Sequence, residues 1–590
     1  MASDYLPISD YGFLSDCRSA ALSAKNGSID WLCWPRFDSP SIFGRLLDSH
    51  KGGCFKVEPL DDYSVERHYL PSTNVLQTTF TTSKGVVRLT DWLHKGSRQA
   101  LCRLIMGIEG EVEMTLHCDP RPNYGSEHVT WQPRLGYLVA EVEDDFRLIL
   151  DGMSGTKETR LVSEGEIIEL TLGLNRPGPS DILSSLRRTV HFWEHWSEEL
   201  LLPDYNQEIV KRSALVLKGL QYEPSGSIVA AATTSLPEEI GGVRNYDYRF
   251  SWIRDASLTL HALISVGKDD EAQSWFDWLK SVMLHTGSSD LQIMYGIDGE
   301  TELPERTLDH LEGYQHSTPV RIGNAAAKQK QLDIYGKLLN TIWLHQQTNQ
   351  RPLSSHSWLL VKALANRACN EWREPDEGIW EVRDGKHHFV YSKAMCWVAL
   401  DRAIQIAEDN QYFLEDAPIA EWRKERDEIH RDVLEKGYSD EKQSFTQSYG
   451  SLSLGAECLR LAQMGFISAD DPRYISTVRA IQKELTRNGL VDRYNHETTA
   501  DGFTGSEGTF TICSLWLVLS LAEIGAVDEA ETLFRKVLAC ANDLGLLSEE
   551  LSPEGEQLGN FPQAFSHIAI IACAFALESV KKNEPLADFG

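Results

Sequence analysis

From about residue 200 onward the chain carries a long series of helical segments joined by links of two alternating lengths. Apolar residues recur there with the 3.6-residue period of amphipathic helices, and cap signals bound about twelve segments. Twelve segments make six antiparallel pairs. The segments that we expect are 204–221, 251–267, 269–286, 324–348, 354–372, 390–410, 418–439, 451–465, 471–486, 509–525, 526–543 and 560–583.

The links between these segments predict a closed ring. Links from odd-numbered to even-numbered segments are long, from about 11 to about 37 residues, whereas most helix links have about 2–8. Links from even-numbered to odd-numbered segments have at most about 7 residues. In a ring of helical hairpins all odd-to-even links lie at the same end, so the long loops share one face. We therefore predict an (α/α)6 barrel with its functional residues on that face.

The first part of the chain has a different pattern. Short runs rich in β-branched and aromatic residues alternate with turn signals, as in NVLQTTFTT, GVVRLTDWL and EIIELTLGL. Runs of this kind predict an antiparallel β-sandwich. We place the sandwich at residues 1–178, a helical linker at 179–203 and the barrel at 204–590.

Charge and cysteine usage limit the partners and the compartment. A formal net charge of −30 disfavours nucleic acid and anionic membranes as partners, and it is compatible with a neutral substrate such as a sugar. The 11 cysteines are scattered without a CxxC pair, which indicates reduced thiols, mostly buried. We see no signal peptide and no apolar run long enough to span a bilayer, so we expect a cytoplasmic protein. The sequence does not indicate an oligomeric state.

Two carboxylates on the predicted long-loop face suit acid–base chemistry. Glu381 precedes the sixth helical segment and follows Trp380, an apolar wall that favours a protonated carboxyl. Glu549 precedes the twelfth segment and follows Ser548, whose hydroxyl could orient it. The third and sixth hairpins lie on opposite sides of a ring, so the two carboxylates would face each other across a cleft. Hydrolysis of a glycosidic bond uses such a pair, one to protonate the leaving oxygen and one to activate water or attack the anomeric carbon.

Other loop carboxylates compete with this pair. Most carboxylates in loops are solvated surface charges, and composition alone does not separate Glu381 and Glu549 from their neighbours. The competitors are Asp376, Glu377, Glu507, Glu550, Glu554 and Glu556.

The segment NYDYRFSWIRDASL, at the start of the second helical segment, combines aromatic and charged residues. Tyr248 and Trp252 lie close in sequence to Arg254 and Asp255. Aromatic faces stack on sugars and charged groups bind their hydroxyls. The residues alone favour a simpler interpretation, a buried Arg–Asp pair at a helix start among core aromatics.

Taken together, these segments resemble glycoside hydrolase family 15, the family of glucoamylases and bacterial-type trehalases. NYDYRFSWIRDASL is similar to the family's YxWxRD segment, GIWE to its general-acid segment, and LLSEE with GEQLGNFPQAFSH to its general-base segment. The opening YGFLSDCRSAALSAKNGSIDWLCWPRF resembles the N-terminal β-domain of the trehalase-like branch. The resemblance covers nearly the whole chain.

The resemblance implies a role for each matched residue. Glu381 would be the general acid and Glu549 the general base of an inverting enzyme that releases a terminal α-linked glucose. Arg254 and Asp255 would hold the far hydroxyls of that glucose, and Tyr248 would stack at the cleavage subsite. The mechanism needs no cofactor and no metal. Further substrate-contact candidates are Trp252, Trp380 and, with a structural salt bridge as an equal alternative, Arg321, Arg493 and Glu507.

Two departures from the glucoamylase pattern bear on the substrate. Val382 follows the acid where fungal glucoamylases have a second Glu, and Glu550 follows the base where they have Gln. These departures favour a short α-glucoside, above all α,α-trehalose, with isomaltose, maltose and longer dextrins as alternatives. Two alternatives from other classes are a sugar epimerase, which would rely on paired histidines, and a non-catalytic sugar-binding protein, which would have lost one carboxylate.

Overall fold

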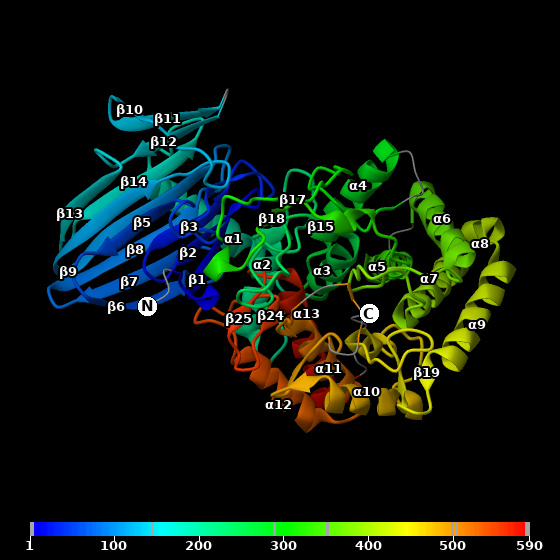
Figure 1. The fold of residues 1–590 in the computed structure, drawn as a ribbon. Coiled ribbons are helices and arrows are strands. Elements are labelled where there is room, and N and C mark those ends of the chain that lie inside the picture. The colour runs from blue at the N-terminus through cyan, green and yellow to red at the C-terminus, as the bar shows by residue number, and fades with distance from the viewer. Residues whose placement is uncertain are drawn as a thin grey trace.

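The computed structural model of the chain describes residues 5–143, 146–286, 291–349, 353–496, 499, 501–502 and 505–584. Strands make up its N-terminal part and helices most of the rest (Figure 1).

The N-terminal part consists of 14 strands in antiparallel pairs, and the long strand β9 (Ala100–Asp119) belongs to both of its layers. The first half of β9 pairs with β8 and β14, and the second half pairs with β5 and β13. Strands that are not hydrogen-bonded pack face to face, β1 and β2 against β8 and β5 against β7. The predicted antiparallel β-sandwich is thereby confirmed. The other strands are β1 (Tyr11–Ser15), β2 (Ala20–Ala24), β3 (Ser28–Cys33), β4 (Ser41–Phe43), β5 (Cys54–Pro59), β6 (Tyr63–Tyr69), β7 (Leu76–Thr82), β8 (Gly85–Leu93), β10 (Trp131–Arg134), β11 (Tyr137–Glu143), β12 (Phe146–Asp151), β13 (Lys157–Ser163) and β14 (Ile167–Leu174).

Helix α1 (Ile182–Glu198) packs on the sandwich. Ile182 joins Cys102 and Leu104 of β9 in a small apolar cluster, and the Ser185 hydroxyl accepts a hydrogen bond from Trp92 Nε1 at 3.1 Å. With cover on both faces, the first half of β9 is almost continuously buried, whereas burial alternates along its second half.

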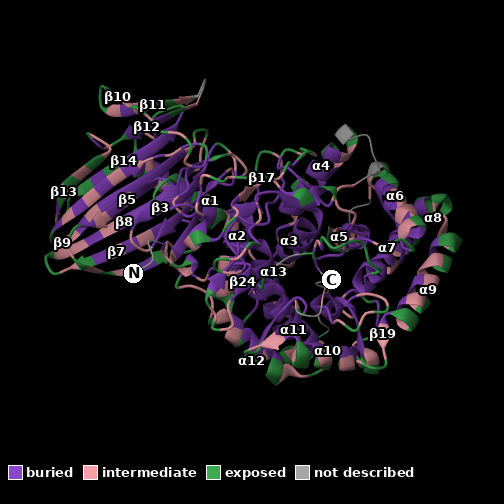
Figure 2. Cartoon of the chain, in the orientation of Figure 1, coloured by how far each residue is buried: buried purple, intermediate pink, exposed green. Residues whose placement is uncertain are grey.

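The barrel has an inner ring of six segments in which each contacts the next and α13 contacts α3. The inner ring is almost entirely buried, whereas α9, α10 and α12 outside it expose their outward sides (Figure 2). This arrangement confirms the predicted (α/α)6 barrel. The inner segments are α3 (Ile253–Ser265), α5 (Asp333–Asn349), α7 (Val390–Glu408), the 3-10 helix η4 (Ala456–Arg460), α11 (Thr511–Glu523) and α13 (Ala564–Lys582), and the outer helices are α2 (Gln207–Leu220), α4 (Asp269–Thr286), α6 (Ser355–Glu371), α9 (Ile419–Lys436), α10 (Pro472–Glu484) and α12 (Val527–Leu538).

Three details of the helical prediction were wrong. The segment expected at 451–465 is not an α-helix: it forms only η4 and turns, because Gly455 and Gly465 bound it and leave little room for a helix of ordinary length. The segment expected from residue 324 begins at Asp333, after the separate 3-10 helix η3 (Ala325–Lys328). The link after α7 contains an additional short helix, α8 (Gln411–Asp416).

Among the described residues, helix α13 has the length and apolarity of a membrane span. From the sequence we expect no apolar run of that length. In its most apolar window 78% is buried inside the protein. Its composition follows from its position among α2, α3 and α11, where apolar residues are required on nearly all sides.

The long loops precede the six inner segments, so they converge where the inner ring begins. The pockets described next are built almost entirely from these loops and the first turns that follow them.

Candidate active site

Two adjoining pockets lie on the long-loop face. The first encloses about 360 Å³ of space between the atoms and the second about 380 Å³, and in both this space includes a part that is open to solvent. Four residues line both pockets, namely Tyr248, Trp380, Glu381 and Arg493. Glu381 therefore lies at the junction of the two.

Glu381 is held in an unusual backbone conformation in the loop before α7. Its φ of 55° lies in the left-handed region that side chains other than glycine rarely adopt. Its Oε1 accepts hydrogen bonds from Trp252 Nε1 at 3.2 Å and from Arg254 Nη2 at 3.3 Å. Because both donors bind Oε1, the second oxygen, Oε2, is the one suited to carry a proton.

Arg254 and Asp255, in the first turn of α3, form one wall of the first pocket. Both are buried, and Arg254 Nε donates to Asp255 Oδ2 at 3.2 Å. Arg254 also lies over the ring of Phe565, 5.3 Å from its centroid. Burial raises the pKa of Asp255 to about 6, although the charge of Arg254 opposes the shift. Arg254 and Asp255 thus form the buried pair expected at a helix start, and the same two residues form this wall of the pocket.

Glu549 lies in the first pocket, just before strand β24 (Glu550–Leu551). Its side chain fits against Gly559, where an added Cβ would lie only 2.9 Å from Glu549 Oε2. Burial raises the pKa of Glu549 well above its usual range, and the negative charge of Glu238 adds to the shift. A hydrogen bond from the Tyr248 hydroxyl and the charge of Arg493 act in the opposite direction.

Trp380 and Arg493 are each held by a buried carboxylate. Trp380 Nε1 donates to Glu457 Oε2 at 2.7 Å. Arg493 donates from Nε to Glu507 Oε1 at 2.7 Å and from Nη2 to Oε2 of the same carboxylate. Trp380 and Arg493 line both pockets, whereas Glu507 lies behind Arg493 and lines neither.

Arg321 turns towards the backbone of a neighbouring loop. Its Nη1 donates to the carbonyl oxygens of Val243 at 2.8 Å and Asn245 at 3.0 Å, and its guanidinium lies over the Tyr246 ring. It lines neither pocket. Arg321 therefore supports the loop that carries Tyr246.

Several residues that line the pockets were not among the predicted site residues. The second pocket is also lined by Arg244, Tyr246 and Arg383, and the first by Gln563 and Phe565. Arg383, Gln563 and Phe565 lie in or directly beside the segments that carry the family resemblance, so their sequence position was a usable signal. Tyr246 lies inside the segment NYDYRFSWIRDASL and Arg244 directly precedes it, so the same signal applied to both.

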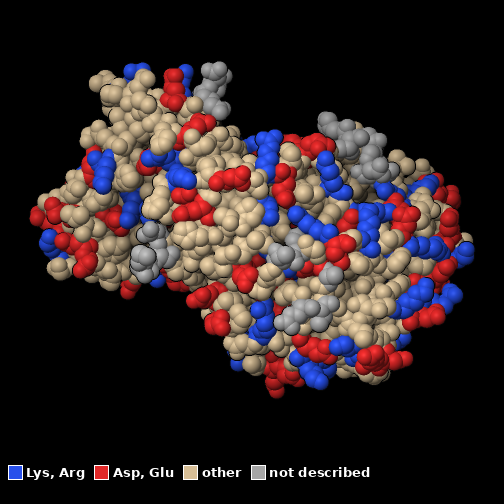
Figure 3. All heavy atoms as spheres, viewed as in Figure 1, with Lys and Arg blue, Asp and Glu red and all other residues tan. Residues whose placement is uncertain are grey.

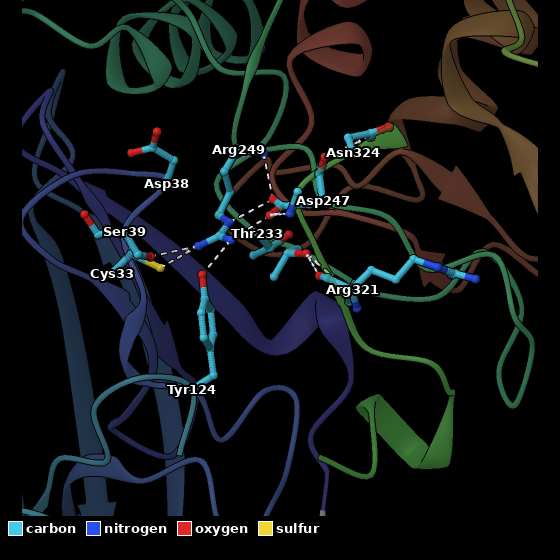
Figure 4. Close-up of polar contacts among 12 residues, drawn as sticks. Cys33, Asp38, Ser39, Tyr124, Thr233, Asp247, Arg249, Arg321 and Asn324 are labelled. Carbon is cyan, nitrogen blue, oxygen red and sulfur yellow. Dashed lines mark hydrogen bonds and ion pairs between the residues drawn. The ribbon is translucent and has the colours of Figure 1, made fainter. Parts of the chain in front are cut away.

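Tyr248 is flanked by Asp247 and Arg249, and Arg249 ties its loop to the sandwich (Figure 4). Arg249 donates to both carboxylate oxygens of Asp247, at 2.8 and 2.7 Å. It also donates to the Tyr124 hydroxyl at 2.8 Å and to the Ser39 carbonyl at 2.9 Å, and both of these belong to the N-terminal part. The sandwich therefore contributes to the position of an active-site loop.

Both parts of the chain match known families. Residues 205–575 match the family model of glycosyl hydrolases family 15, and residues 2–156 match the trehalase-like N-terminal domain. The chain belongs to glycosyl hydrolase family 15. It is therefore a glycosidase, and the epimerase and sugar-binding alternatives are set aside.

Relatives of this family 15 enzyme align with nearly its whole length. The trehalase of Mycolicibacterium smegmatis is 39% identical, and the alignment covers 97% of this chain and 91% of the relative. The trehalase of Thermoplasma volcanium is 37% identical, with 97% and 94% covered. A bacterial glucoamylase complexed with acarbose shares the fold, with a TM-score of 0.71 at 14% identity over 98% of this chain and 94% of that chain.

Proposed function

We propose that the enzyme hydrolyses α,α-trehalose to two glucose molecules, with inversion at the anomeric carbon that is attacked. The observation that carries this proposal is the similarity to trehalases over both domains. Six trehalases, from 39% down to 31% identical, align with 94% or more of this chain. A likeness confined to the barrel would support only the family.

In the proposed reaction Glu381 and Glu549 act as acid and base. Glu381 donates its proton from Oε2 to the glycosidic oxygen, and the bond from that oxygen to the anomeric carbon breaks. Glu549 takes a proton from water, whose oxygen attacks the same carbon from the opposite face. The two donors on Glu381 Oε1 stabilise the carboxylate that remains after proton transfer. The Tyr248 hydroxyl and Arg493 favour the ionised form that Glu549 needs.

The two pockets suit the two rings of a disaccharide. In our proposal the first pocket holds the glucose that undergoes inversion, with Arg254 and Asp255 on its distal hydroxyls and Tyr248 and Trp252 against its face. The second pocket holds the leaving glucose beside Arg383. Glu381, which borders both pockets, then lies next to the bond between the rings.

The surface and the cysteines agree with this assignment. On the face shown in Figure 3, acidic and basic side chains are interspersed, which suits a neutral sugar that needs no electrostatic steering. All 11 cysteines are free, and all but Cys540 are buried, which supports the cytoplasmic location that we expect.

Glucose release from trehalose, maltose, isomaltose and a longer dextrin at matched concentrations tests the substrate. We expect trehalose to be turned over at least about tenfold faster than the others, a difference of roughly 1.4 kcal/mol in activation free energy. Faster release from maltose, isomaltose or the dextrin would overturn the proposal and favour the glucoamylase-type alternative.

Proton NMR of the first products tests the stereochemistry. Inversion at one carbon of α,α-trehalose yields one β-glucose and one α-glucose before mutarotation. Two α-glucose molecules would refute inversion, whatever the rate.

A further inference from the structure

Glu550 is turned away from the active site although it directly follows Glu549. Successive side chains of an extended segment point to opposite faces, so Glu549 faces the first pocket and Glu550 lies behind it, fully buried. There one carboxylate oxygen of Glu550, one of Glu238, which lines the second pocket, and one of Glu507 lie within 4.8 Å of one another. The cluster joins three loops that are far apart in the chain.

The guanidinium groups beside this cluster already bind other carboxylates. Arg493 forms two hydrogen bonds to Glu507, and Arg244 donates to Glu507 Oε2 at 2.6 Å and to Asp501 Oδ2 at 2.8 Å. The ion pair that Arg493 makes with Glu238 is longer, at 3.5 Å. Glu507 and Asp501 therefore take the short hydrogen bonds of both guanidinium groups, and Glu238 is attracted by the same two charges at longer range.

Two oxygens of Glu238 and Glu550 lack a hydrogen-bond donor. Glu550 Oε2 accepts from the Gly508 amide at 2.8 Å, but Glu550 Oε1 and Glu238 Oε2 are buried and accept no hydrogen bond. A buried carboxylate oxygen without a donor is strongly unfavourable. One proton on either side chain removes one of two like charges whose oxygens lie within 4.8 Å of each other, and its O–H can turn towards the neighbouring carboxylate.

We propose that Glu238 and Glu550 share a single proton and that this pair is a positioning element that allows Glu549 to ionise as the base. If both members were anions, their field would hold a proton on Glu549. If the pair carries one negative charge, that field is halved. The proposal rests on the proposed function only through the role of Glu549.

The electrostatic surroundings of the pair agree with a shared proton. Burial raises the pKa of Glu238 to about 7, and it raises the pKa of Glu550 well above its usual range. Charged or titratable groups that face the pair are Glu507, Glu549, Glu381, Arg493, Arg244, Arg487, Tyr246 and Tyr248, with His496 3.5 Å from Glu507.

Three variants test the proposal, namely Glu550→Gln, Glu238→Gln and the double variant. In each single variant the remaining carboxyl ionises against the new amide, so the pair keeps its charge of −1. The acidic limb of the kcat–pH profile, which reports the base in the enzyme–substrate complex, should then move by less than about 0.3 unit. In the double variant the pair is neutral, the pKa of the base falls, and the limb should move to lower pH by about one unit or more.

Infrared difference spectra of the substrate-free enzyme at neutral pH give a readout besides activity. The spectrum of wild type minus each single variant should contain one carbonyl band of a protonated carboxyl, because the bands of Glu381, Glu457 and any other protonated carboxyl are common to both proteins and cancel. This measurement needs no turnover and uses only wild type and the single variants. It therefore tests the shared proton even where the double variant does not fold. A failure to hydrolyse trehalose would overturn the proposed function and leave the infrared result intact.

Several results would overturn the shared proton. Limb shifts in each single variant that add in the double variant would show two anions, and no shift in any variant would show a pair without charge. A difference spectrum without a carbonyl band in both single variants would likewise contradict one shared proton. Stoichiometric binding of Mg²⁺ by wild type but not by the double variant, measured by calorimetry, would show that a cation takes the proton's place.

Discussion

Arg249 in the barrel and Tyr124 in the sandwich form a buried hydrogen bond, in which Arg249 Nη2 donates to the Tyr124 hydroxyl at 2.8 Å. Arg249 also forms a two-point contact with Asp247, and Tyr248 lies between these two residues in sequence. The bond therefore couples the N-terminal domain to the loop that carries an active-site tyrosine.

We expect Tyr124→Phe to weaken this coupling. Loss of a hydrogen bond to a charged group costs about 1.5–3 kcal/mol, so the thermal unfolding midpoint should fall and kcat/KM should fall with it. Tyr412→Phe, at a residue that is 69% exposed on α8, is the matched control and should leave both unchanged. An unaltered midpoint in Tyr124→Phe would mean that the contact contributes nothing to the stability of the domain junction.

Glu381→Gln and Glu549→Gln should each keep the fold and lose turnover. Removal of a general acid or base typically lowers kcat by about 10²–10⁴-fold, and the change from carboxyl to amide preserves side-chain shape. Circular dichroism checks the fold and glucose release measures the loss. Near-normal activity in either folded variant would remove that residue from the mechanism.

Gly559→Ala should impair catalysis because the added methyl group would press on the base. The new Cβ would lie 2.9 Å from Glu549 Oε2, and the backbone φ of +72° is strained for alanine. Gly525→Ala, at φ +81° with no atom within 4 Å of the new Cβ, has the same backbone strain without the contact.

Both glycine variants should lose about 1–2 kcal/mol of stability from the left-handed backbone. Only Gly559→Ala should lose kcat, by about tenfold or more if the base moves by an ångström or so. Equal activities in the two variants would show that the contact with Glu549 does not position it.

Glu457→Gln should remove a pH dependence of stability. Burial raises the pKa of Glu457 from 4.5 to about 7, so between these values unfolding releases a proton and the stability of wild type falls as pH rises. The amide cannot ionise but still accepts the hydrogen bond of Trp380. The variant should therefore be more stable than wild type above pH 7, by up to about 3 kcal/mol, and equal to it near pH 4. Denaturant unfolding of both proteins near pH 4 and above pH 7 measures this. A difference in the free energy of unfolding between variant and wild type that is the same at both pH values would contradict it.

Arg383→Ala should weaken binding of the leaving glucose in the second pocket more than binding of the glucose in the first pocket. Arg383 lines the second pocket only, so KM for trehalose should rise by about tenfold, the effect of roughly 1.4 kcal/mol of lost binding. Hydrolysis of p-nitrophenyl α-glucoside, whose leaving group has no sugar hydroxyls, should change less. Arg535→Ala, at an exposed ion pair on α12, is the control. Equal effects on both substrates would place Arg383 outside the leaving-group site.

Much of the architecture was predictable because its signals are local. The 3.6-residue periodicity and the alternation of loop lengths belong to short stretches of chain, and they identified the ring and the face on which Glu381 and Glu549 lie. The segment at 451–465 escaped this logic. Its apolar pattern is helical, but Gly455 and Gly465 bound it, and only the 3-10 helix η4 forms there.

The sequence by itself determined the sandwich, the ring of helices and the loops that hold the two carboxylates, because each follows from periodicity, turn residues and motif spacing. Only the tertiary structure decided how the remaining charges are used. Arg321 turns to backbone carbonyls, and Glu550, behind the first pocket, meets Glu238, which lines the second. Such pairings depend on which distant loops pack together and on the energetic cost of burying a charge without a partner, and neither is encoded in a local pattern.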